Sequence, residues 1–227
     1  MKKLIAILAM ITISISVMAA KYVEVRPVAP FYMIENNTRI PVHYYHSAVN
    51  KVEVVGYRND VARVVTRVVG GRLFIEDMGV MRSMPIVNVY CSRLDLYDGT
   101  GDFIAKTAMT LMNVIFNLSG PARLDLGRVD AHQFTINARG TGHVNVRDAH
   151  VDGPHNINNY GTGKVTFNGR TQETVVMNHN QGNVRGKVST QQFNGTNMGQ
   201  GNINMRGQAQ RVVTEKKGPG KSEFKRR

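Results

Sequence analysis

Tryptophan is absent from the 227-residue chain, and cysteine occurs only once. The single cysteine, Cys91, excludes an intramolecular disulfide in an oxidising compartment. It lies in the strand-like run 86–91, which predicts a buried and inert thiol. Because tryptophan is absent and the aromatic residues do not alternate with the basic tail, the chain lacks the stacking platform of a nucleic-acid binder. We therefore expect no specific nucleic-acid partner.

Long apolar runs are confined to the first 20 residues. Lys2 and Lys3 precede an apolar stretch from Leu4 to Val17, and Val17-Met18-Ala19 is a small-x-small cleavage site. Roughly 15 apolar residues are too few for a bilayer span of about 20, so we predict a cleaved signal peptide over 1–20. The mature chain is then exported to the periplasm, the outer surface or the medium, with no transmembrane span.

Acidic residues are also scarce, at 16 against 29 lysines and arginines, which gives a formal charge of +13. Such a balance favours contact with anionic glycans or envelope polymers. Metal ligands are poorly placed, because among seven histidines only His43 and His46 are closely spaced, with no cysteine or carboxylate nearby to complete a site. The sequence therefore predicts neither a metal site nor a cofactor.

A repeat occupies most of the chain from Gly99 to Arg206. Small residues recur at steps of 19 to 21 residues, at positions 101, 122, 142, 163, 182 and 201. A fixed period of this size is typical of a solenoid. Each period contains glycines and β-branched residues but little of the alanine, leucine and glutamate that helices prefer.

Each small residue is followed by a polar and then an apolar residue, the alternation of a strand with one buried face. The predicted inward residues are Phe103, Leu124, Val144, Val165, Val184 and Ile203. A second set, Asn117, Asn137, Asn158, Asn178 and Asn197, precedes the glycine turns. Asparagine tolerates left-handed backbone angles and can stack coil on coil as an amide ladder.

These patterns predict an all-β fold, a parallel β-helix-like solenoid with about six coils of 19–21 residues preceded by an irregular β cap. We expect an extended, proline-containing lead-in over 21–45, with an edge strand near 31–34. The solenoid domain is predicted over 46–207. A basic and disordered tail is expected over 208–227, because it has little apolar material.

The turns Gly140-Thr-Gly-His-Val-Asn-Val146 and Gly161-Thr-Gly-Lys-Val-Thr-Phe167 resemble those of the auto-transporter adhesin head domain, called the GIN domain. The likeness covers roughly Val49 to Arg206. It departs from the family pattern at Gly120-Pro-Ala, Gln181 and Gln200. The resemblance implies a right-handed parallel β-helix-like domain on exported bacterial proteins, with no known catalytic residues.

The outward residues Arg123, His143 and Lys164 fall at one repeat position on successive coils. Since neighbouring strands lie about 4.8 Å apart, this row could match the charge spacing of a polyanion. The leading hypothesis is thus a non-enzymatic adhesion or interaction module of the bacterial envelope that contacts anionic polymers through a basic face and tail.

Two alternatives remain open. A polysaccharide-degrading β-helix enzyme acting on acidic glycans would need two carboxyl groups about 5 to 9.5 Å apart, and the candidates are Asp130, Asp148 and Asp152. A scaffold that associates end to end through its terminal coils is the other alternative.

Overall fold

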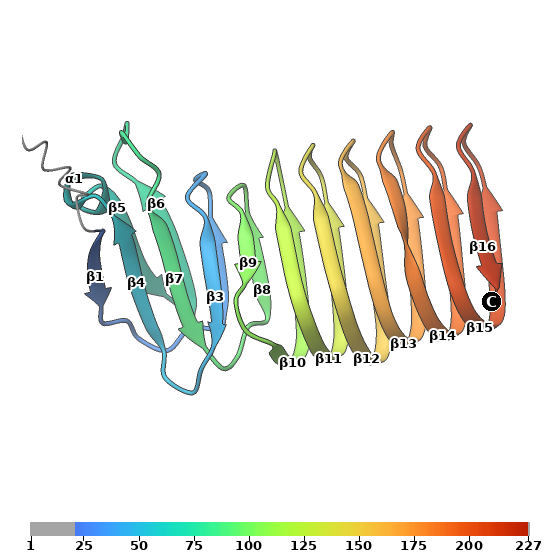
Figure 1. The fold of residues 1–227 in the computed structure, drawn as a ribbon, viewed down its shortest axis with the longest axis horizontal. Coiled ribbons are helices and arrows are strands. Elements are labelled where there is room, and N and C mark those ends of the chain that lie inside the picture. Colours follow the sequence, from blue (N-terminus) through green and yellow to red (C-terminus); the bar gives the residue numbers. More distant parts are fainter. Residues whose placement is uncertain (1–20, 227) are drawn as a thin grey trace, which may run out of the picture.

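The computed structural model describes residues 21–226 as one elongated rod of stacked β-strands (Figure 1). The narrow turns of successive coils line one edge of the rod (Figure 1). Within the described range the only helix is α1 (Arg58–Val61), so the all-β class predicted from the sequence is confirmed. The predicted signal peptide, 1–20, lies outside the described residues.

The regular part of the rod consists of long strands that each pair in parallel with the next. They are β10 (Met109–Leu118), β11 (Leu124–Ala138), β12 (Val144–Asn159), β13 (Lys164–Asn178), β14 (Asn183–Asn197) and β15 (Ile203–Lys216). The pairing of β11 with β12 shifts register between Ala131 and Phe134. Each strand leads through a glycine-containing turn to the start of the next, so successive strands are successive coils. The predicted parallel β-solenoid is confirmed.

The interior of the solenoid is the apolar column that the repeat predicts. Its members are partners in register across adjacent coils: Phe103, Leu124, Val144, Val165, Val184 and Ile203. Each is at most 2% exposed. Phe116 and Phe134 fill the opposite side of the interior, with ring centroids 5.9 Å apart. One coil cannot bury these faces alone, so the stack is the cooperative unit.

The glycines of the turns are required by close approach between coils. A Cβ atom on Gly142 would overlap the carbonyl oxygen of Ala122 in the preceding coil, and one on Gly163 would overlap that of Gly142. Neither glycine has a positive φ. No non-glycine residue within 21–226 has a positive φ either, so the asparagines there do not use the left-handed angles that this residue type tolerates.

The N-terminal end is an irregular β cap, as the sequence predicts, but its boundaries differ. Its strands are β1 (Tyr22–Arg26), β2 (Met33–Asn36), β3 (Val42–His46), β4 (Lys51–Gly56), β5 (Val64–Val69), β6 (Arg72–Asp77), β7 (Ile86–Cys91), β8 (Leu96–Gly99) and β9 (Phe103–Ala105). Strand β4 pairs antiparallel with β1 and β7, and β5 pairs antiparallel with β6.

Residues 33–46 do not form the lead-in or the edge strand that the sequence suggests. Strand β2 lies between β6 and β8, and β3 lies between β7 and β9, with all pairs parallel. The stack therefore begins before the predicted boundary at residue 46. Pro27, Pro30 and Pro41 fall between the strands, so none of them interrupts a hydrogen-bonded ladder.

The C-terminal tail over 208–226 is ordered, and the expectation of disorder there is wrong. Strand β15 continues to Lys216, and β16 (Ser222–Arg226) pairs in parallel with it. Phe224 lies beside Met205 in register and packs against Phe193, with ring centroids 4.7 Å apart. Gly220 follows Gly201 by 19 residues, the step of the preceding coils, so the tail is a further coil with a polar composition.

The predicted asparagine ladder is present as two separate ladders. In the outer ladder, Asn137 Nδ2 donates to Asn117 Oδ1 and Asn158 Nδ2 donates to Asn137 Oδ1, both at 2.8 Å. These three side chains are half-buried. The ladder ends there because Asn158 pairs with Met177 in the next coil.

The inner ladder begins one residue later, at Asn159. Asn159 Nδ2 donates to Asn178 Oδ1 at 2.8 Å, and Asn178 Nδ2 donates to Asn197 Oδ1 at 3.0 Å. All three are 0% exposed. Strand β12 therefore belongs to both ladders, since the outer one ends at Asn158 and the inner one begins at Asn159. In the two preceding coils the position of Asn159 is occupied by the apolar residues Leu118 and Ala138.

Membrane-spanning helices are not found in the part of the chain from 21 to 226, since no helix there has the length and apolar character to cross a bilayer.

Candidate functional site

The predicted binding row lies at the entry to three successive coils. Arg123 and His143 directly precede β11 and β12, and Lys164 is the first residue of β13. Because the residues that follow them are partners in register, the three occupy one column on the surface. Arg123 and His143 are exposed, whereas Lys164 is half-buried.

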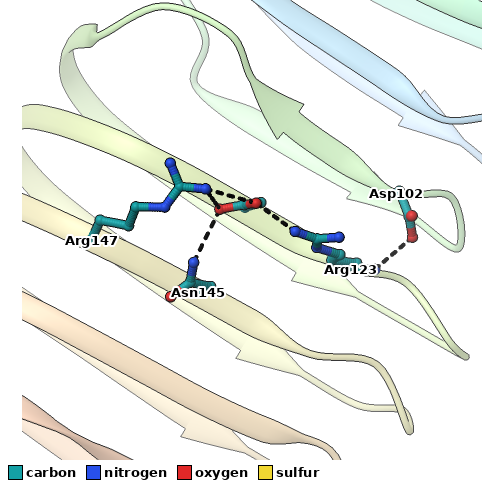
Figure 2. Close-up of polar contacts among 5 residues, drawn as sticks. Asp102, Arg123, Asn145 and Arg147 are labelled. Atoms are coloured by element: carbon teal, nitrogen blue, oxygen red, sulfur yellow. Dashed lines mark hydrogen bonds and ion pairs between the residues drawn. The ribbon is translucent and has the colours of Figure 1, made fainter.

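Arg123 is already engaged by an acidic neighbour. Its Nη2 atom lies 2.6 Å from Asp125 Oδ2, while Arg147 Nη2 lies 2.9 and 3.0 Å from the two oxygens of the same carboxylate. Figure 2 shows the two guanidinium groups on either side of that carboxylate, which Asn145 Nδ2 also contacts at 3.1 Å. The main-chain N–H of Arg123 donates to Asp102 at 2.8 Å.

Asp125 alone leaves one excess positive charge on Arg123 and Arg147, and the Asp102 carboxylate beside them offsets it. The Asp125 side chain is 7% exposed, but those of Arg123 and Arg147 are 54% and 63% exposed. A nearly buried carboxylate therefore orients two arginines that remain open to solvent. Such an arrangement can bind an anion without moving either side chain far.

A denser group of cations lies on the last coils. We call the basic groove the surface lined by Arg185, Lys187, Arg206 and Lys225, with Thr166, Asn168, Asn204 and Glu223 beside them. It encloses about 560 Å³, and Gly186 and Met205 also line it. All four basic side chains are exposed.

The strand register places these cations. Lys187, Arg206 and Lys225 are partners in register on β14, β15 and β16, and Arg185 is two residues before Lys187 on the same face. Neighbouring strands are about 4.8 Å apart, so the column presents one cation per coil. No ion pair involves these four side chains in the described part of the chain.

The carboxylates considered for glycan cleavage have neighbours that oppose an acid role. Asp130 pairs with Arg128 at 3.0 Å, and His150 contacts Asp130 at 3.3 Å and Asp148 at 3.6 Å. The hydrogen bond from Arg128 lowers the pKa of Asp130 below its ordinary value. A general acid needs the opposite shift. Asp152 is exposed on β12, four residues after Asp148.

His43 and His46 do not converge on one point. They lie three residues apart on β3, so their side chains leave opposite faces of the strand. His46 Nδ1 lies 3.2 Å from the Tyr44 hydroxyl, and burial together with the charge of Lys106 lowers the pKa of His43. Among residues 21–226 no three histidine, cysteine or acidic side chains are gathered as a metal site.

Cys91 is 0% exposed. Burial raises the pKa of its thiol to about 12, so the reactive thiolate is not populated at neutral pH.

Sequence reasoning missed both the cluster around Asp125 and the basic groove. It considered only the first outward position of each coil, where Arg123, His143 and Lys164 fall. The groove occupies the next two outward positions, and the same two-residue alternation identifies Arg185 and Lys187 there. Lys225 was not identified because the tail was predicted to be disordered and not a further coil.

Comparison with known proteins gives structural similarity alone. No family model matches the chain, and no curated protein sequence matches it. A crystal structure of a "putative adhesin" from Bacteroides fragilis aligns with a TM-score of 0.75 at 17% identity, over 91% of this chain and 97% of that one.

Two further crystal structures from Parabacteroides distasonis are similar. One, of a "putative adhesin", has a TM-score of 0.71 at 17% identity and covers 89% of this chain and 97% of its own. The other, of a "putative lipid binding protein", has a TM-score of 0.67 at 14% identity and covers 92% and 98%. At these identities the similarity shows a shared fold across nearly the whole chain.

Proposed function

We propose that this protein is a non-enzymatic binding module of the bacterial envelope whose basic groove holds acidic polymers, with uronate-containing glycans as the favoured class. The observation that carries the proposal is the column of Lys187, Arg206 and Lys225, which have no carboxylate partner in the described structure. Two of the similar solved structures bear the description "putative adhesin", which agrees with a binding role.

The spacing of the groove suits an extended ligand. Cations at steps of about 4.8 Å match a chain that carries one negative charge per sugar. Each exposed contact is weak by itself, but several contacts on one rigid column act together and raise the overall affinity. The rod supplies that rigidity, since each column residue lies on a strand paired along its length.

The groove also fits the charge of the whole chain. Removal of the two signal lysines would leave a formal charge of +11 on the mature chain. Further cations lie towards the middle of the rod, namely Arg123, His143, Arg147 and Lys164, although Asp102 and Asp125 offset the two arginines there. We propose export to the envelope as the setting in which such a surface meets acidic polymers.

Catalytic cleavage of the glycan is the less favoured function. Asp130 is paired with Arg128, and its lowered pKa keeps it ionised and unable to donate a proton at neutral pH. Release of reducing ends or unsaturated sugars from an acidic glycan, abolished by Asp130→Asn or Asp148→Asn, would nevertheless establish an enzyme and overturn the binding role as the complete function.

The test is retention on immobilised polygalacturonate at increasing salt. The groove variant carries Arg185→Gln, Lys187→Gln, Arg206→Gln and Lys225→Gln, and we expect it to elute at markedly lower salt than the natural chain. The control variant has the same net charge but loses four exposed cations elsewhere, Arg39, Lys106, Arg211 and Lys216, each replaced by Gln. We expect its elution to stay close to that of the natural chain.

Equal losses in both variants would mean that net charge, and not the groove, causes retention. Binding that is unchanged from about 50 to about 500 mM salt would contradict an electrostatic site altogether. A third variant, with Arg123→Gln, His143→Gln and Lys164→Gln, measures the contribution of the row predicted from the sequence.

A further inference from the structure

A loop at the N-terminal end of the rod exposes apolar side chains. We call residues 78–85, between β6 and β7, the tip loop. Met78 is 68% exposed, Val80 is 89% exposed and Met84 is 49% exposed. The loop is tied to α1, which lies at the end of the rod opposite to the C-terminus (Figure 1).

The exposure is imposed by a buried anchor. The Asp60 side chain, in a residue that is only 4% exposed, accepts the main-chain N–H groups of Arg82 at 3.0 Å and Ser83 at 3.1 Å. At the other end of the loop, the N–H of Met78 donates to the Arg63 carbonyl at 2.8 Å. Between these anchors Met81 packs against the core. The loop is thus held in a shape that directs apolar groups to solvent.

Cations surround the tip loop. Arg58, Arg63 and Arg82 are exposed, and none of them has an ion pair with another residue in the described range. Of the nearby acids, Glu76 is paired with Arg67, Asp60 is the buried anchor of the loop, and Asp77 is the last residue of β6, so the three arginines face two carboxylates that are unpaired in that range. The tip therefore combines apolar protrusions with a net positive charge.

We infer that the tip loop docks on an anionic phospholipid surface, a site separate from the basic groove. Exposed apolar side chains flanked by arginines are the combination that inserts into the boundary between headgroups and acyl chains while pairing with lipid phosphates. Three protruding side chains cover far less than the roughly 1,200 Å² that a stable protein interface needs, which disfavours a second protein as the occupant. Docking would place the rod end-on, with the groove away from the bilayer.

The absence of tryptophan from the chain allows a direct test. Val80→Trp introduces the only indole, at the most exposed point of the loop, and Gln191→Trp puts it at an exposed position on the regular stack. The mature chain, without residues 1–20, is mixed with vesicles of phosphatidylglycerol and phosphatidylcholine or of phosphatidylcholine alone. We expect a blue shift of the emission for Val80→Trp with the anionic vesicles only, and none for Gln191→Trp.

Cosedimentation with the same vesicles tests the chemistry of the tip without a fluorophore. Met78→Ser with Met84→Ser should lower the bound fraction several-fold, and Arg63→Gln with Arg82→Gln should do the same. Val80→Trp introduced into the groove variant should show the same blue shift as Val80→Trp in the natural chain, because the two sites are independent.

Three results would overturn the inference. One is an unchanged emission of Val80→Trp in anionic vesicles, and another is an equal shift for Gln191→Trp. The third is a concentration-dependent doubling of mass in light scattering that Met78→Ser with Met84→Ser abolishes, since a second copy would then be the occupant of the tip.

Discussion

His155 is a histidine in the apolar interior of the rod, and it is 0% exposed. Its ring lies between those of Phe134 and Phe167, with centroids 4.9 and 4.0 Å away. Nδ1 is 2.9 Å from the Phe134 carbonyl oxygen and must donate to it, whereas Nε2 has no partner. Burial lowers the pKa of His155 from 6.5 to about 4, so the neutral ring is the folded form.

The stability of the rod should therefore depend on pH through this residue. A lowered pKa means that the unfolded chain binds the proton more readily, so stability is lost as pH falls from about 6.5 towards 4. The loss amounts to about 3 kcal/mol at most. His155→Phe should remove this contribution, and urea unfolding at pH 7 and pH 4.5 measures it. Equal losses in the natural chain and the variant would contradict the assignment.

At the residue scale, the sequence predicts which face of a strand a side chain occupies better than it predicts the contacts of that side chain. Two-residue alternation places Leu124 inside and Arg123 outside, because strand geometry alone decides the face. It does not reveal that Arg123 and Arg147 share Asp125, since that contact depends on side-chain reach between coils. The same alternation also puts His155, two residues before the buried Ile157, on the inward face of β12, and this signal was overlooked.

At the scale of single elements, the two asparagine ladders differ in burial and therefore in their expected contribution to stability. Asn178 in the inner ladder accepts from Asn159 and donates to Asn197, and all three side chains are shielded from bulk solvent. Asn137 makes the equivalent pair of bonds in the outer ladder, where its half-buried amide neighbours can be hydrated after its removal.

Removal of the inner amide should be much more costly than removal of the outer one. Asn178→Ala leaves the buried Asn159 Nδ2 donor unpaired, while Asn197 Oδ1 keeps only the Gly199 N–H at 3.3 Å. We expect a loss of about 2 kcal/mol in the free energy of unfolding. Asn137→Ala should cost about 1 kcal/mol or less. Urea unfolding of both variants makes the comparison, and equal losses would show that burial does not separate the ladders.

The strands were predictable where each repeat of the sequence contains both its own glycine turn and its own inward apolar residue. The 19 to 21 residue spacing identified the coils from β10 to β15, because each glycine turn and inward residue is local to its coil. The insertion of β2 between β6 and β8 was not predictable, since it pairs residues 39 and 63 positions apart in sequence. The last coil was missed because its polar composition concealed Phe224 at the inward position.

At the scale of the whole molecule, the rod carries two different surfaces at its two ends. The irregular cap presents the tip loop, and the last coils present the basic groove. The solenoid between them keeps Lys187, Arg206 and Lys225 in one column, a property that no isolated coil would have. The central claim is that this column binds an extended acidic polymer with an affinity that depends on the length and charge of the polymer.

The most direct measurement is the affinity for oligogalacturonates of increasing length, taken by titration calorimetry at low salt. We predict that affinity rises with each added uronate until the oligomer spans the three strands of the column, about 10 Å, and then levels off. The groove variant should lose this dependence on length. A single uronate that binds as tightly as the longer oligomers, or no binding at any length, would contradict the account.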